Sequence, residues 1–218
     1  HPDFTIDTYC DLISWVHEIG PYIHLHAFSP DEVSHAASMS NLSSVEVLER
    51  LKAAGLGSLQ GTAAEILVDS VRKVICPRKV CTAEWVRIIK EAHNMGIPST
   101  ATIMYGSCET EHDRAEHLGI LRNIQDETNG FTELVPLTYI HTNTPLYKAG
   151  IARAGATGRE DLLMIAVSRL FLENFDNIQV PWGKLGLKTS QLTLLSGGNY
   201  LAGTMFSDDV SLNSGATD

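Results

Sequence analysis

The stretch that decides the fold is TAEWVRIIKEAHNMGIPSTATIMYG, residues 82–106. Its first part predicts a helix over Thr82–Asn94, with Thr82 as the N-cap and Gly96 as the terminator. The second part predicts a strand over Ile97–Tyr105, where apolar and hydroxyl residues alternate. A helix that leads directly into a strand is the repeating unit of α/β proteins.

The same alternation extends in both directions from this unit. Before it, the pattern predicts a helix over Thr5–Ile19, a strand over Tyr22–Phe28, a helix over Ser44–Ala54, a strand over Leu56–Gly61 and a helix over Thr62–Val71. After it come a helix over Thr110–Asp126, a strand over Phe131–Ile140, a helix over Asp161–Leu172, a strand over Asn177–Val180 and a final helix from Ser190. Strands that alternate with helices in this way are parallel and are joined by crossover helices.

Two α/β architectures fit this order, an open doubly wound sheet and a closed barrel. The open sheet usually carries a glycine-rich phosphate turn after its first strand, whereas this chain has His24-Leu25-His26. Polar groups at the carboxyl ends of the strands are typical of a barrel's active-site face. We therefore expect a single domain over residues 1–218 with the α/β fold of a partial TIM-type (β/α) barrel. A full barrel has about eight strands, so about three are expected to be missing in front of His1, where no initiator Met stands.

Composition excludes several classes of function. The chain has 218 residues and a formal net charge of -10, and its Lys and Arg residues are scattered, which argues against a nucleic-acid surface. No apolar run is long enough to span a membrane. Four cysteines, too few and too irregular for a disulfide framework, favour reduced thiols and a cytoplasmic location. They are Cys10, Cys76, Cys81 and Cys108.

Three groups of residues are candidates for binding. His24 and His26 are two apart on a strand, so both imidazoles can face one cavity. Zinc would need a third ligand that is not evident nearby, so substrate hydrogen bonding or barrel packing is favoured. Glu65 is expected in the first turn of a helix, where it either binds a ligand or stabilises the helix dipole. Thr100 and Thr102 place hydroxyls on one strand, where they could bind a ribose or an adenine edge.

Four longer segments together resemble one known family. They are HLHAFSPDEV (24–33), GLGSLQGTAAEILVDSVRKVICPRK (55–79), STATIMYG (99–106) with HLGILRNIQDETNGFTELVPLTYIHTNTPLY (117–147), and LLSGGNYLAGTM (194–205). They resemble the radical S-adenosylmethionine (SAM) enzymes that build aromatic cofactors. The greatest resemblance is to the second half of FO synthase, the family of 5-amino-6-(D-ribitylamino)uracil–L-tyrosine 4-hydroxyphenyl transferases of deazaflavin biosynthesis. It covers essentially the whole chain.

The resemblance implies a barrel, two cofactors and two substrates. The cofactors are SAM and a 4Fe-4S cluster held by a CxxxCxxC loop, and none of the four cysteines lies in such a loop. The substrates are L-tyrosine and 5-amino-6-(D-ribitylamino)uracil, and the other FO synthase half is a further candidate partner. Two alternatives stay open, a futalosine-type radical SAM enzyme of menaquinone biosynthesis and a degenerate, non-catalytic barrel fragment.

The resemblance also implies roles for particular residues. SAM contact is expected for Glu65, Thr100 and Thr102, and substrate contact for His24, His26, Asn199 and Thr204. No catalytic residue is assigned.

The sequence departs from the family at two positions that we expect on the active face. The family's YGH reads Tyr105-Gly106-Ser107, and its NDLGGT has Tyr200 in place of the carboxylate. The chain alone is therefore expected to be inactive. Its open strand edges are also expected to make it self-associate.

Overall fold

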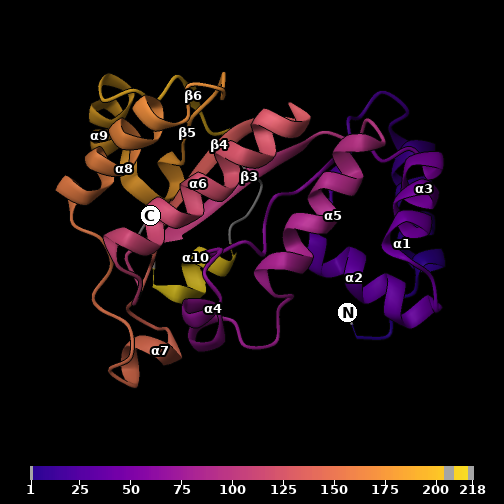
Figure 1. Cartoon of the computed structure of the whole chain (residues 1–218), viewed down its shortest axis with the longest axis horizontal. Coiled ribbons are helices and arrows are strands. Elements are labelled where there is room, and N and C mark those ends of the chain that lie inside the picture. Colours follow the sequence, from indigo (N-terminus) through magenta and orange to yellow (C-terminus); the bar gives the residue numbers. More distant parts are fainter. Residues whose placement is uncertain (1, 204–208, 216–218) are drawn as a thin grey trace.

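The computed structural model describes residues 2–203 and 209–215 (Figure 1). Its strands are β1 (His26–Ala27), β2 (Ser58–Leu59), β3 (Ser99–Tyr105), β4 (Phe131–Thr138), β5 (Gln179–Val180) and β6 (Tyr200–Leu201). Its helices are α1 (Ile6–Ile19), α2 (Pro30–Ser40), α3 (Ser44–Ala54), α4 (Asp69–Ile75), α5 (Thr82–Asn94), α6 (Glu111–Thr128), α7 (Pro145–Lys148), α8 (Gly158–Phe171), α9 (Trp182–Leu195) and α10 (Asp209–Ser214).

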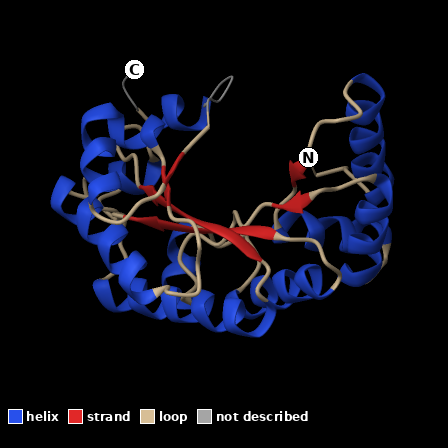
Figure 2. Ribbon diagram, turned by 90° about the horizontal axis from the view of Figure 1, so that it is seen from above, coloured by secondary structure: helices blue, strands red, loops and turns tan. Residues whose placement is uncertain are grey.

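All strand pairs are parallel, and the strands follow one another in chain order. β1 to β4 form one sheet in the order β1-β2-β3-β4, and β5 pairs with β6. A parallel bridge between Leu134 and Ile178 links the two sheets. Figure 2 shows the strands as an arc with the helices around its outer side, open between its two ends. An arc covered by helices on its outer side is part of a barrel and not a doubly wound sheet, so the predicted fold class is confirmed.

The core lies between the strands and the surrounding helices. On β2 to β5, residues of one parity are buried in the core, among them Leu59, Ala101, Ile103 and Leu134. Residues of the other parity therefore point to the concave side of the arc, because successive side chains on a strand alternate in direction. We call this concave side the inner face. No helix in the described ranges, 2–203 and 209–215, combines the length and apolar character needed to cross a membrane.

Several element predictions need correction. The described residues contain six strands where five were predicted, because Tyr200 and Leu201 form β6. The strand predicted over Tyr22–Phe28 is limited to β1, α9 begins at Trp182, before the predicted Ser190, and α7 and α10 were not predicted. A helix predicted over Thr62–Val71 is wrong, since the chain stays irregular until α4 begins at Asp69. The whole of α2 was not predicted, although Ser29 and Glu32 form a capping box at its start.

Candidate functional site

Polar side chains form a row along the inner face. Register fixes two pairs of neighbours, since His26 lies opposite Ser58 on β2, and Gln179 lies opposite Tyr200 on β6. The row consists of His24, His26, Ser58, Gln60, Thr100, Thr102, Glu133, Gln179 and Tyr200. In small-molecule sites, a few convergent polar groups fix the orientation of the ligand, and this row offers such groups.

The Ser58 hydroxyl joins the two predicted histidines. Its Oγ lies 2.8 Å from Nε2 of His24 and 2.8 Å from Nδ1 of His26. Gly57 makes room for this arrangement, because a Cβ there would lie 2.5 Å from the His24 ring. The structure therefore brings His24 and His26 together on the inner face, as the sequence predicted for their orientation.

The surroundings of His26 favour its neutral form. Burial lowers its pKa, and the neighbouring His24 lowers it further. A neutral imidazole has one donor and one acceptor nitrogen. With Nδ1 bonded to Ser58, the remaining nitrogen of His26 can bond a substrate as a donor or as an acceptor, according to the tautomer.

Glu65 does not occupy the first turn of a helix, so the prediction of its position is wrong. It lies in the irregular loop of residues 61–68 that follows β2, with a φ of 46° in the left-handed region. Its carboxylate forms an ion pair with Lys79 at 2.6 Å, and its carbonyl accepts a hydrogen bond from the Met104 N–H at 2.8 Å. The helix-dipole explanation therefore does not apply to Glu65.

Buried polar groups hold this loop in place. The Arg72 guanidinium is 3% exposed and donates hydrogen bonds to the carbonyls of Ala63, Ala64 and Val80. His117 accepts a hydrogen bond from the Leu67 N–H at 2.9 Å, and burial lowers its pKa to about 3. Since the backbone groups of the loop are satisfied by distant residues, its irregular shape is fixed.

Thr100 and Thr102 also bind the loop. The Gly61 N–H donates to Oγ1 of Thr100 at 3.0 Å, and the Thr102 hydroxyl donates to the Gly61 carbonyl at 2.6 Å. A Cβ on Gly61 would lie 1.9 Å from the Thr100 carbonyl oxygen, so only glycine fits this approach. Both threonines are on the inner face, but these bonds engage their hydroxyls. Their contact with SAM stays a prediction.

Asn199 directly precedes β6, at the amino end of that strand. Its side-chain oxygen accepts hydrogen bonds from the Ile178 N–H at 2.8 Å and from Arg169 at 2.7 Å. Its amide group donates to the Asp176 carbonyl at 2.9 Å. These bonds join β5 to β6, and they do not support substrate contact, which stays a prediction. Thr204 lies outside the described residues.

Ser107 lies two residues after the carboxyl end of β3 and is fully buried in the turn before α6. Its hydroxyl donates to Glu109 at 2.9 Å, and its place on the active face stays a prediction. Glu109 also accepts from the Gly106 N–H at 2.6 Å and pairs with Arg114 at 2.7 Å. Tyr200, in contrast, is on the inner face and about half exposed.

Sequence reasoning missed Ser58, Glu133 and Gln179. Glu133 on β4 accepts a hydrogen bond from the Gln179 amide on β5 at 3.1 Å, and burial raises the pKa of Glu133. A carboxylate directly before the apolar run of residues 134–137 was the available signal, because charged residues are seldom buried without a reason.

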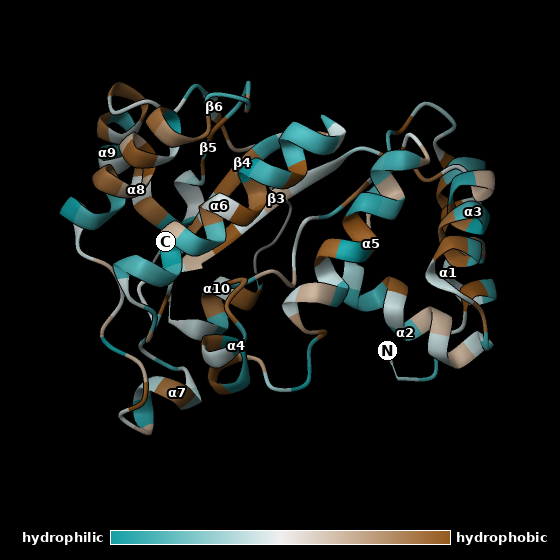
Figure 3. Cartoon of the chain, in the orientation of Figure 1, coloured by the Kyte–Doolittle hydropathy of each residue, from teal (hydrophilic) through white to brown (hydrophobic). Residues whose placement is uncertain are grey.

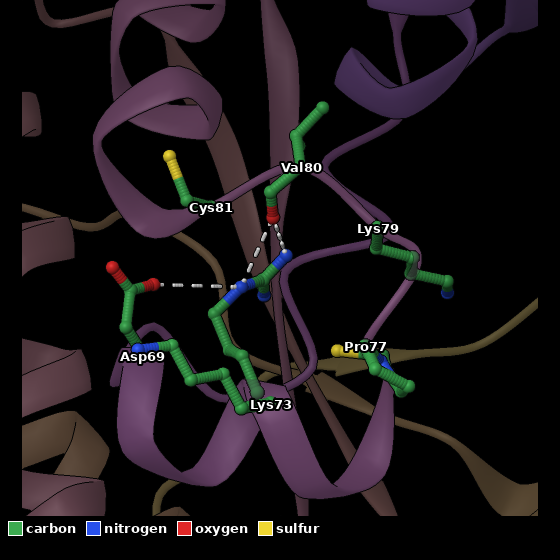
Figure 4. A pocket seen from close by; sticks show the side chains of 8 residues that line it. Asp69, Lys73, Pro77, Lys79, Val80 and Cys81 are labelled. Carbon is green, nitrogen blue, oxygen red and sulfur yellow. Dashed lines mark hydrogen bonds and ion pairs between the residues drawn. The ribbon is translucent and has the colours of Figure 1, made fainter.

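A small cavity lies next to the loop, outside the row of polar residues. Its volume is about 190 Å³, and Figure 4 shows Lys73, Val80 and Cys81 at its wall. The lining residues are Asp69, Arg72, Lys73, Cys76, Pro77, Lys79, Val80 and Cys81. Arg72 bonds carbonyls and Lys79 pairs with Glu65, so these two cations are engaged within the protein.

The described cysteines are dispersed. Cys10, Cys76, Cys81 and Cys108 are free thiols, and burial raises the pKa of the Cys76 thiol. Within the part of the chain that the structure describes, no three His, Cys, Asp or Glu residues are grouped so that they could hold a metal ion.

Comparison with known proteins gives two family matches. Residues 11–121 match the family described as the radical SAM superfamily, and residues 128–218 match the CofH/MqnC C-terminal region. Several relatives are named 5-amino-6-(D-ribitylamino)uracil–L-tyrosine 4-hydroxyphenyl transferase. The protein from Methanoculleus marisnigri is 60% identical over 100% of this chain and 59% of its own length. The protein from Methanosphaerula palustris is 61% identical over 100% of this chain and 60% of its own length. The protein from Methanocaldococcus jannaschii is 50% identical over 99% of this chain and 61% of its own length.

The chain thus spans about three fifths of the length of these relatives. Among solved structures, the crystal structure of methylornithine synthase (PylB) has a TM-score of 0.62 at 16% identity. The match covers 89% of this chain and 51% of that chain. At this identity it shows likeness of fold alone.

Proposed function

Since this chain belongs to the radical SAM superfamily, we propose that it forms part of an enzyme that joins the 4-hydroxybenzyl group of L-tyrosine to 5-amino-6-(D-ribitylamino)uracil. One observation carries the proposal, the identity of about 60% over the whole chain to proteins named for that transfer. The substrates, the second FO synthase half as a partner, and a cytoplasmic location all belong to the proposal. So does the single-domain organisation of residues 1–218.

The cluster of this superfamily does not fit the residues that the structure describes. It takes three cysteines from one CxxxCxxC loop, whereas the four cysteines here are separated and ungrouped. In the superfamily, the cluster and SAM together supply a 5′-deoxyadenosyl radical. We assign binding and orientation to the described residues and propose that activity requires the cluster ligands from additional sequence.

The SAM-binding role is proposed for the loop after β2 and the adjacent strand. Glu65 is the best supported of the three residues, because its carboxylate is partly exposed on a loop fixed by Arg72 and His117. A carboxylate can accept hydrogen bonds from ribose hydroxyls or from an ammonium group. Thr100 accepts from the Gly61 N–H, so its hydroxyl proton remains for a bond to a ligand. Thr102 donates its proton to the Gly61 carbonyl, so its proposed contact is through the lone pairs or the methyl group.

Substrate contact is proposed first for His24 and His26. They are neighbours on the inner face, and the neutral His26 imidazole can hold or accept a proton at a fixed position. A phenol or an aminouracil needs such a directional partner to be oriented for reaction. Asn199 and Thr204 remain in the proposal with less support, because Asn199 bonds within the protein and Thr204 is outside the described residues.

The test is an anaerobic assay of the chain completed with the cluster-binding segment of a relative. Incubated with SAM, L-tyrosine and 5-amino-6-(D-ribitylamino)uracil, it should form the hydroxybenzyl adduct, detected by mass spectrometry. A parallel reaction with futalosine-pathway substrates should give no product. The opposite result would favour the menaquinone branch, and no turnover with either set would favour a non-catalytic module.

A further inference from the structure

Glu133 is a carboxylate held in an unusual place. It lies on β4 directly before Leu134, which is buried in the core. The side chain of Glu133 points to the opposite side of the strand, the inner face. It is half-buried, and the Gln179 amide at 3.1 Å is its partner. Burying a carboxylate costs free energy unless hydrogen bonds or a cation compensate for the lost hydration.

The protein supplies little of that compensation. A carboxylate has about four lone-pair sites for hydrogen bonds, and the Gln179 bond uses one of them. In residues 2–203 and 209–215, Glu133 forms no ion pair, unlike Glu65, Glu109 and Glu160. Accordingly, burial raises the pKa of Glu133, and the bond from Gln179 offsets this only in part.

A half-buried carboxylate that lowers the stability of the fold is expected to have a function, and binding a ligand is the function that suits Glu133. The oxygens of Glu133 accept hydrogen bonds, and the second amide proton and the carbonyl of Gln179 remain for other partners. Together, Glu133 and Gln179 present hydrogen-bond acceptors beside a hydrogen-bond donor. An aminouracil ring has the complementary edge, with ring and amino N–H groups beside carbonyl oxygens.

We propose that Glu133 and Gln179 form the subsite that recognises the N–H and C=O edge of the aminouracil substrate. This inference rests on the proposed function and adds the residues that select one of its two substrates. L-Tyrosine fits the pair less well, because its carboxylate would be repelled by Glu133 and its ring offers no donor–acceptor edge. The tyrosine ammonium group is the competing occupant.

The inference is tested by binding, which needs no cluster. The probe is 6-(D-ribitylamino)uracil, a stable compound without the reactive 5-amino group, and calorimetry gives its Kd for the full chain. Glu133→Gln should weaken binding on the order of tenfold to a hundredfold, as expected for a hydrogen bond to a charged group. The control is Glu116→Gln, the same change on the exposed side of α6, which should leave the Kd unchanged.

Thermal unfolding separates binding from a structural role. Glu133→Gln should leave Tm unchanged or raise it, because the amide removes a half-buried carboxylate. Equal affinity of Glu133→Gln and the parent chain would overturn the inference, and so would a loss of L-tyrosine affinity in place of the uracil. Absence of uracil binding by the parent would overturn it as well. The proposed function is judged separately by product formation in the completed enzyme, so the two can fail independently.

Discussion

The Ser58 hydroxyl has one proton and two imidazole neighbours. Within the described residues its Oγ bonds no group other than Nε2 of His24 and Nδ1 of His26. Its proton therefore goes to one ring, and the other ring donates to the hydroxyl oxygen. If His26 accepts at Nδ1, both rings carry their proton on Nε2, and in the reverse case both carry it on Nδ1. One hydroxyl thus couples the tautomers of both histidines.

We predict that the His24 and His26 rings have the same tautomer in this chain. Nitrogen NMR of the imidazoles distinguishes Nδ1–H from Nε2–H, and both rings should give the same pattern. Ser58→Ala should remove the coupling and give averaged signals. Gly57→Ala serves as the comparison, because its Cβ displaces the His24 ring while the His26–Ser58 bond remains. Different tautomers in the two rings of the parent chain would refute the coupling.

Among the secondary-structure elements, those with local signals were predicted and those fixed by distant contacts were not. The helix α5 matches its predicted range, and β3 and β4 differ from theirs only at the ends. The loop of residues 61–68 could not be predicted, because Arg72 and His117 determine its path from other parts of the chain. The candidate site followed the same rule. The parity of His24 and His26 was readable from the sequence, whereas the bond between them through Ser58 was not.

The loop after β2 should depend strongly on Arg72. Replacing it with Met keeps the approximate volume but leaves the carbonyls of Ala63, Ala64 and Val80 without a donor. Unsatisfied buried carbonyls cost about 1–3 kcal/mol each without being additive, so we expect a loss of about 3 kcal/mol in the free energy of unfolding, measured with urea. Hydrogen exchange in residues 61–68 should become faster.

The matched control for Arg72 is its neighbour in α4. Lys73→Met removes a cation from an exposed position of the same helix and should change stability by about 0.5 kcal/mol or less. Equal effects of the two substitutions would show that the guanidinium does not hold the loop.

Two buried histidines anchor helices α5 and α6 and should make the fold sensitive to acid. Burial lowers the pKa of His93 to about 4 and that of His117 to about 3. The ordinary pKa of histidine is about 6.5. At pH values between the folded-state pKa and about 6.5, these histidines are therefore protonated in the unfolded chain and neutral in the folded chain. The free energy of unfolding should therefore fall as the pH drops below about 6.5, by up to about 1.4 kcal/mol per pH unit for each histidine.

Substitution isolates this contribution from groups of opposite sign. Burial raises the pKa values of Glu133 and Asp161, so these carboxyls favour the folded state on acidification. Between about pH 6.5 and 4.5, His93→Gln should reduce the slope of the unfolding free energy against pH. The reduction should correspond to about one bound proton, or about 1.4 kcal/mol per pH unit. An unchanged slope in His93→Gln would contradict a neutral, buried His93.

At the scale of the whole molecule, the arc ends in two strands with a free edge each. β1 pairs only with β2, and β6 pairs only with β5, among the strands that the structure describes. Exposed apolar side chains accompany both ends. Near β1 they include Ile19 and Tyr22, which are 88% and 99% exposed, and on α9 beside β6 Leu195 is 86% exposed. Figure 3 shows many hydrophobic residues along α8 and α9, and Leu170 and Leu187 on these helices are exposed.

A free parallel edge flanked by apolar side chains is a template for pairing with another chain. We therefore expect the isolated chain to associate, with a mass from light scattering that exceeds the monomer's 23.8 kDa and grows with concentration. The double change Tyr22→Lys and Ile23→Lys places charges beside β1 and should reduce the mass towards the monomer. Val74→Lys, at an exposed position of α4, adds one charge away from both edges and should not reduce the mass. A monodisperse monomer at all concentrations would mean that the edges are protected by their short length and twist, and the predicted association would be wrong.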